Sequence, residues 1–110
     1  MKFFDWFTES PEMLLSKLRL SIDKIDLQLI ELLGYRFNYV KQIANIKKHH
    51  GIPIEDPERH AQIQKNVELM VRLHNLPVEP EIKRIFVTII NESIDYQKSL
   101  LSTNKQTNKK

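Results

Sequence analysis

An all-helical fold is predicted for this chain from three features of its sequence. Glycine occurs only at Gly34 and Gly51, so tight-turn chemistry is nearly absent. Apolar residues recur at the three- and four-residue spacing of an amphipathic helix through residues 14–47. Two proline-containing breaks then separate this pattern from two further helical ones. The sequence therefore predicts one small domain of three helices, the first of them long.

The first predicted helix begins at Ser10-Pro11-Glu12, which supplies a cap residue, a proline at the first helical position and an acid in the first turn. It runs to about His49 and stops at Gly51-Ile52-Pro53. A helix of this length in a small domain suggests a partner helix running alongside it. Its apolar stripe consists of Leu15, Leu18, Ile22, Ile25, Leu29, Leu32, Leu33, Val40 and Ile43.

The second predicted helix opens with Asp56 as its cap and Pro57 in its first turn, and it ends at Asn75. Its expected inner face is Ile63, Val67, Met70 and Val71. The third helix is expected over residues 81–101, after the break at residues 77–80. Its expected inner face is Ile82, Ile85, Phe86, Ile89 and Ile90.

Two flanks lie outside this helical domain, which is expected to span residues 12–101. Residues 1–11 form an aromatic extension with Phe3, Phe4, Trp6 and Phe7. We expect it to pack on the domain, with contact to a partner or cover over the site as alternatives. Residues 102–110 are polar and have nothing to bury, so they are expected to be disordered.

Charge and composition argue against several classes of function. The net charge of +3 is modest and is partly due to the tail, whereas nucleic-acid binding favours a dense basic stripe. There is no cysteine, hence no disulfide framework and no thiolate ligand or nucleophile. The histidines lack a metal-ligand spacing; they are His49, His50, His60 and His74. No apolar run is long enough to span a membrane and no secretory signal is evident, so we expect a cytoplasmic protein that needs no metal or cofactor.

Cations interrupt the apolar stripe of the first helix. Arg36 lies between Leu33 and Val40, where a side chain should face a core. A buried cation is too costly without a counter-ion, so we expect a small anion to bind there. Lys47 follows about three turns later on the same face, roughly 16 Å along the axis. Arg19 lies ~25 Å before Arg36 and roughly 100° around the helix, so it could serve the same ligand only from a second copy of the chain.

The other two helices also place polar groups on their inner faces. Arg59 lies one turn before Ile63, and Ser93 and Gln97 continue the buried stripe of the third helix. Taken singly, an arginine on a stripe is usually an edge residue that extends its charge to solvent, and Ser93 and Gln97 could be ordinary interface hydrogen-bonders. The inner faces carry no carboxylate that could pair with these cations. As a set they favour an anion-binding site inside the bundle.

These residues, in this order, resemble the all-helical chorismate mutases of the AroQ class over about residues 14–101. The resemblance rests on the following motifs: Leu18-Arg19-x-x-Ile22-Asp23-x-Ile25-Asp26, Leu32-Leu33-x-x-Arg36, Lys47, Pro53-Ile54-x-Asp56-Pro57-Glu58-Arg59 and Ile89-Ile90-x-x-Ser93-x-x-x-Gln97. Each motif alone is weak, and the ordered series is specific. It implies an intertwined homodimer of three-helix chains in which each of two sites borrows one arginine from the other subunit.

The resemblance also assigns roles. Arg19 would be the borrowed arginine, and with Arg36 it would clamp the carboxylates of a small dianionic substrate, with Arg59 nearby. Lys47 and Gln97 would donate to the ether oxygen of chorismate as its C–O bond breaks. The reaction implied is the Claisen rearrangement of chorismate to prephenate in the shikimate pathway of aromatic amino acid biosynthesis. It depends on holding a compact conformer and on donors aimed at developing charge.

Asp56 and Ser93 match positions that contact the substrate hydroxyl and a carboxylate. His60 occupies a further position that contacts the substrate hydroxyl in the family, where the family usually has a glutamate. His60 would either contact the substrate or face solvent. The departure keeps two other substrates open, isochorismate (for a pyruvate lyase) and 4-amino-4-deoxychorismate. Those lyases tend to lack the residues that match Asp56 and Ser93, so the mutase is favoured. A non-catalytic helical dimer is the alternative from another class.

Overall fold

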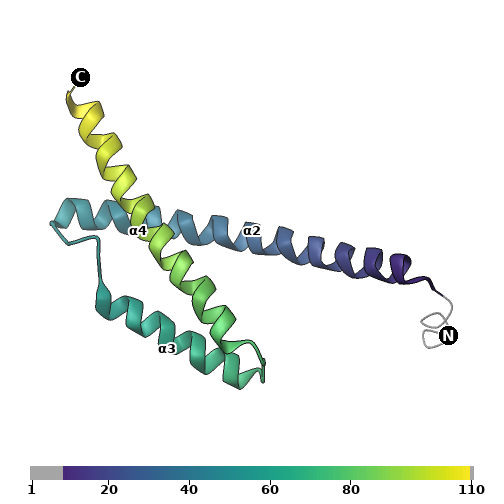
Figure 1. Cartoon of the computed structure of the whole chain (residues 1–110). Helices are drawn as coiled ribbons and strands as arrows, with labels where there is room; N and C mark the ends of the chain where they lie inside the picture. The colour runs from purple at the N-terminus through teal and green to yellow at the C-terminus, as the bar shows by residue number, and fades with distance from the viewer. Residues whose placement is uncertain (1–8, 110) are drawn as a thin grey trace. The chain divides into compact units, whose positions relative to one another are not determined.

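The computed structural model describes residues 9–109, and the side chains of residues 9–102. Within these residues the chain is all-helical, as predicted, with the helices α2 (Pro11–His50), α3 (Pro57–Leu73) and α4 (Glu79–Lys109) shown in Figure 1. The aromatic residues of the N-terminal extension lie outside the described part. The chain divides into two compact units at Arg36, so residues 9–36 and 37–109 are described separately.

The ends of α2 follow from local chemistry. The Ser10 hydroxyl accepts a hydrogen bond from the Met13 amide at 3.2 Å, and Pro11 occupies the first helical position. At the other end Gly51 takes a positive φ of 63°, which costs glycine little. The Ile52 amide then donates to the Lys47 carbonyl at 2.9 Å. This is the hydrogen bond of a Schellman motif, and it stops the helix.

The ends of α3 match the prediction closely. The Asp56 side chain caps the helix by accepting from the Arg59 amide at 3.1 Å. Asn75 follows the helix with a φ of 53°, and the Leu76 amide donates to the Val71 carbonyl at 3.0 Å. Asparagine tolerates this left-handed conformation better than most residues. The break that leads into α4 is therefore encoded by Asn75 as well as by the prolines.

α4 is longer than predicted. It begins at Glu79 and continues to Lys109, past residue 101, where the sequence analysis ended it. Residues 102–109 contain neither proline nor glycine, so nothing in the backbone stops the helix there. The expectation of disorder rested on the lack of apolar side chains, and that lack does not by itself end a helix.

Within residues 37–109, α3 and α4 form an antiparallel hairpin, and the C-terminal part of α2 crosses α4 (Figure 1). The buried apolar residues are Val40, Ala44, Val67, Val71 and Ile90. Phe37 on α2 meets Tyr96 on α4 edge to face, with ring centroids 5.5 Å apart. Such a pair stabilises beyond its buried area, and it fixes α2 against α4 next to Gln97.

Two ion pairs join α3 to the start of α4. Lys83 Nζ lies 2.5 Å from Glu68 Oε1, and the Lys83 ammonium lowers the pKa of this carboxyl below its ordinary value. Arg72 donates through two nitrogens to Glu79, at 2.9 and 3.4 Å, and the hydrogen bond to this carboxylate raises the pKa of the guanidinium. The Arg72–Glu79 pair is exposed and the Lys83–Glu68 pair is only half-buried, so each contributes little to stability, but together they fix the register of the hairpin.

Several residues predicted to be inside are exposed within one chain. Met70, Ile85 and Ile43 are 55%, 57% and 46% exposed, although their helices do bury other residues of the same stripes. In residues 9–36 the exposure is more extensive. Members of the stripe there that remain about half exposed or more are Leu15, Leu18, Ile22, Ile25, Leu29 and Leu32. The periodicity correctly identified an apolar face, but a single chain supplies no cover for it.

Candidate functional site

Two polar side chains are buried on the inner face of α4. Ser93 and Gln97 are each only 6% exposed, and they lie one turn apart on the face that also carries Ile90. The Ser93 hydroxyl donates to the Ile89 carbonyl at 2.7 Å. Gln97 Oε1 is buried and has no hydrogen-bond partner. Because a buried polar atom normally has a partner, Gln97 Oε1 marks a candidate binding site in residues 37–102.

Lys47 presents a cation from the last turns of α2. Its side chain is half-buried, and Nζ donates to the Ile54 carbonyl at 2.7 Å. Ile54 lies in the segment between α2 and α3, so the backbone that enters α3 fixes the ammonium group. An ammonium has three N–H donors, and this contact leaves donors for a ligand. The prediction that Lys47 lies on an inner face is consistent with this burial.

Asp56 and Arg59 stand at the start of α3. Asp56 uses Oδ1 for the cap, which leaves its second oxygen as a further acceptor. The Arg59 guanidinium is exposed and donates to Gln62 Oε1 on its own helix at 2.7 Å. In a single chain the arginine thus finds its partner three residues along the helix surface, and its place in the site stays a prediction.

His60 is half-buried, unlike the solvent-facing alternative for this residue. It lines a pocket of about 260 Å³ between α3 and α4, with Ala61, Gln64, Val87, Ile90 and Asn91. Sequence reasoning missed Gln64 and Asn91. The signal for Gln64 was available, since it lies four residues after His60 and therefore on the same face of α3. Nothing in the helical pattern marks Asn91.

Arg19 and Arg36 belong to the unit of residues 9–36. Arg36 is half-buried and Arg19 is exposed. The fold of residues 37–109 thus holds the other candidate residues, which are Lys47, Asp56, Arg59, His60, Ser93 and Gln97. The grouping of both arginines with these residues stays a prediction.

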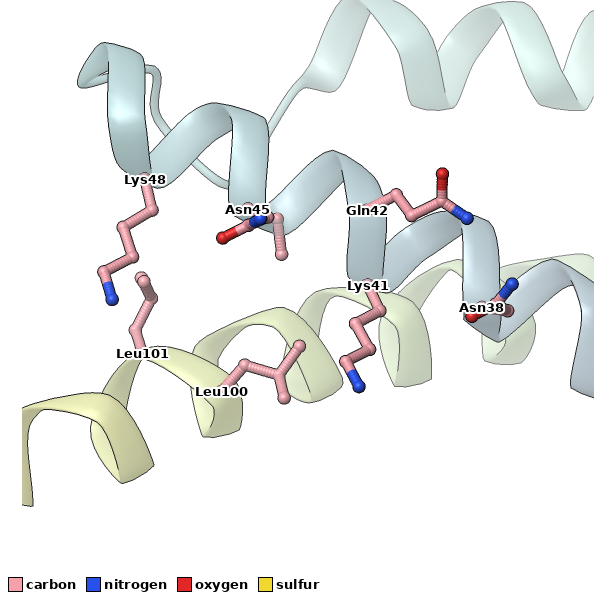
Figure 2. A pocket seen from close by; sticks show the side chains of 8 residues that line it. Asn38, Lys41, Gln42, Asn45, Lys48, Leu100 and Leu101 are labelled. Carbon is pink, nitrogen blue, oxygen red and sulfur yellow. The ribbon is translucent and has the colours of Figure 1, made fainter. Parts of the chain in front are cut away.

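A second pocket, of about 370 Å³, lies where α2 crosses α4, and its lining residues are Asn38, Lys41, Gln42, Ala44, Asn45, Lys48, Leu100 and Leu101. Figure 2 shows Lys41 extending beside Leu100 and Lys48 beside Leu101. None of the candidate site residues lines this pocket. Its polar lining lies on a different face of α2 from Lys47, so we treat it as separate from the site.

The candidate site offers a cation and a hydrogen-bonding amide on the inner faces of α2 and α4. Lys47 supplies a fixed cation, and Gln97 supplies a buried amide whose NH2 and oxygen can exchange places by a half-turn. Among the described residues, no group of His, Asp or Glu is arranged to hold a metal ion. The described helices also include none that is long and apolar enough to cross a membrane. Fold and site together define a small helical domain whose candidate site combines a lysine with a buried amide.

Comparison with known proteins assigns this domain to a family. The family Chorismate mutase type II matches residues 18–98, so the chain belongs to the type II chorismate mutases. It is 35% identical to a chorismate mutase of Methanocaldococcus jannaschii over 96 residues, which cover 87% of this chain and 96% of that protein. This confirms the resemblance predicted from the ordered motifs.

Longer relatives carry a similar segment. The chain is 32% identical over 95 residues to a bifunctional chorismate mutase/prephenate dehydratase of Enterobacter agglomerans, covering 86% of this chain and 24% of that protein. It is 44% identical over 45 residues to a T-protein of Haemophilus influenzae, covering 41% of this chain and 12% of that protein. The similar segment is thus a small part of each of these larger proteins.

Proposed function

We propose that this chain catalyses the rearrangement of chorismate to prephenate. In this reaction the ether C–O bond breaks while a C–C bond forms within one molecule, so no nucleophile or proton transfer is needed. Negative charge develops on the ether oxygen. The observation that carries the proposal is the buried Gln97 side chain, whose Oε1 has no hydrogen-bond partner within the described residues. Rotated by a half-turn, it offers an N–H donor where such an oxygen would lie.

Lys47 is the second donor that we assign to the ether oxygen. Its Nζ is already held by the Ile54 carbonyl, so it needs little reorganisation to meet developing charge. Asp56 and Ser93 are assigned to the substrate hydroxyl and to a carboxylate. Arg59 serves a carboxylate after leaving Gln62, a change of one exposed hydrogen bond.

We further propose a homodimer in which Arg19 of one copy and Arg36 of the other clamp the two carboxylates of the substrate. The support is the uncovered stripe of residues 9–36, where Leu18 and Ile22 are 56% and 54% exposed. Such an apolar face is stable in water only when another surface covers it. A second copy offers the same face and brings Arg19 to a site that its own helix cannot reach.

The site contains His60 where the family usually has a glutamate, and this bears on the substrate. We favour chorismate over isochorismate because Asp56 and Ser93 are both retained, and 4-amino-4-deoxychorismate is the remaining alternative. We propose further that the protein works in the cytoplasm, without a cofactor and without a nucleic acid or membrane partner.

The test is to offer chorismate and isochorismate separately and to identify the products by chromatography. We expect prephenate from chorismate and no release of pyruvate from isochorismate. Pyruvate and salicylate from isochorismate, with chorismate untouched, would identify a lyase instead. A folded protein that changes neither compound would identify a non-catalytic helical dimer.

A further inference from the structure

The pocket between α3 and α4 has a composition suited to one kind of chemical group. Its lining contains the His60 imidazole, the Gln64 and Asn91 amides, and the apolar side chains of Val87 and Ile90. No carboxylate, lysine or arginine lines it. A carboxylate of a ligand would find no strong counter-charge here. An uncharged polar substituent on an otherwise apolar ring fits the lining better.

The orientation of the Gln64 amide is determined by its neighbour. Its Nε2 donates to the Lys83 carbonyl on α4 at 3.2 Å. Because a carbonyl oxygen can only accept, the NH2 group must lie on that side, and Oε1 must lie on the other. Oε1 is buried and has no hydrogen-bond partner. Gln64 therefore holds a fixed acceptor that needs a donor.

The pocket adjoins the proposed reaction site on both helices. On α4, Ile90 lines the pocket and also shares a face with Ser93 and Gln97, three and seven residues further on. On α3, His60 follows Arg59 directly. Ile90 thus belongs both to the pocket and to the face that carries Gln97, and a ligand end in the pocket would need a hydrogen-bond donor to satisfy Gln64.

We propose that Gln64 Oε1, rather than the Asp56 carboxylate, accepts the single hydrogen bond that the ring hydroxyl of the substrate donates, and so determines specificity for a ring that carries a donor. The inference rests on the proposed function. The hydroxyl is the only donor of chorismate at neutral pH, because its two carboxylates and its ether oxygen only accept. An acceptor at Gln64 thus orients the substrate, with the hydroxyl in this pocket and the carboxylates toward the cations.

The test compares kcat/KM for chorismate and for its analogue with hydrogen in place of the ring hydroxyl. Gln64→Met keeps the length of the side chain and removes the acceptor. It should lower kcat/KM for chorismate about tenfold, the scale of one hydrogen bond between neutral groups, and leave the analogue within about twofold of wild type. Gln64→Glu keeps an acceptor toward the pocket but loses the donor to the Lys83 carbonyl, so it should retain more of the chorismate kcat/KM than Gln64→Met does. The matched control is Gln42→Met on the exposed surface of α2, which should leave kcat/KM unchanged for both compounds.

Three outcomes would overturn the inference while wild-type turnover stands. Gln64→Met could lower kcat/KM equally for chorismate and for the analogue, which would indicate a structural role through the hydrogen bond to Lys83. Gln64→Met could also leave kcat/KM unchanged for both compounds. Its effect could also vanish in a His60→Ala background, which would mean that Gln64 acts only through the imidazole. If the wild-type protein turns over neither compound, the proposed function itself fails, and this inference fails with it.

Discussion

Replacing Gln97 by leucine should make the protein more stable and nearly inactive at once. The Gln97 side chain is 6% exposed, and leucine has a similar size, so the packing around it should survive. The substitution removes Oε1, a buried acceptor without a partner. An unsatisfied buried polar group costs about 1–3 kcal/mol, so the free energy of unfolding should rise by about 1–2 kcal/mol.

The same change removes a donor from the ether oxygen. Losing one preorganised donor in an oxyanion-type site costs about 3–4 kcal/mol of transition-state stabilisation, so kcat should fall by about 10² to 10³. The two effects have opposite signs because an amide that lacks a partner in the empty site gains one in the transition state. This trade-off is typical of a binding residue. A residue that only supports packing would lose stability and activity together.

The assay pairs urea unfolding, followed by circular dichroism at one fixed protein concentration, with the loss of chorismate absorbance under saturating substrate. Gln42→Leu is the matched control. Its exposed side chain should change the free energy of unfolding by less than about 0.5 kcal/mol, with kcat unchanged. A Gln97→Leu protein that is less stable than wild type but fully active would refute the reasoning.

Three further predictions test other parts of the site and fold. Lys47→Ala should lower kcat by orders of magnitude, because it removes about 3–4 kcal/mol of transition-state stabilisation. Lys47→Arg should also have a low kcat, because a planar guanidinium does not replace the ammonium that the Ile54 carbonyl holds. Near-wild-type kcat in steady-state kinetics for either variant would contradict the role of Lys47. His60→Glu should keep or raise chorismate turnover and His60→Ala should lower it, whereas unchanged kinetics for both would make His60 a surface residue. The Lys83 ammonium keeps the pKa of Glu68 below its ordinary value, so this pair stabilises the fold above about pH 4.3 and the contribution is lost as pH falls through the lowered value. Urea unfolding across pH 3–7 should therefore show a shallower acid loss for Glu68→Gln than for wild type, and identical curves would contradict the linkage.

Local chemistry made the helix starts and the ends of α2 and α3 predictable. Pro11, Asp56 and Asn75 each act within a few residues, through a fixed φ, a cap or a left-handed turn. The end of α4 was not predictable, because ending a helix needs a stop signal and the tail has none. The apolar faces were identified, but their burial was not, since residues such as Met70 and Ile85 are exposed in a single chain.

For the site, helical periodicity identified polar residues at positions that were expected to be buried. Ser93 and Gln97 could be placed because polar residues on a buried stripe are conspicuous. Arg59 could not be placed, because a long side chain on the first turn can reach either neighbour, and here it bonds to Gln62. Gln64 was missed since its role depends on the Lys83 carbonyl of another helix, a contact that no pattern within α3 reveals.

The central claim is that two copies of this chain build each site, and mixing two inactive variants tests it most directly. Arg19→Ala and Arg36→Ala should each abolish turnover of chorismate. After unfolding and refolding together, about half of the dimers should be mixed, each with one intact site, so about a quarter of wild-type activity should return. Exchange is verified by native mass spectrometry with one variant isotopically labelled. Recovery near a quarter is the predicted result, and a mixture that forms mixed dimers but stays inactive would contradict the account.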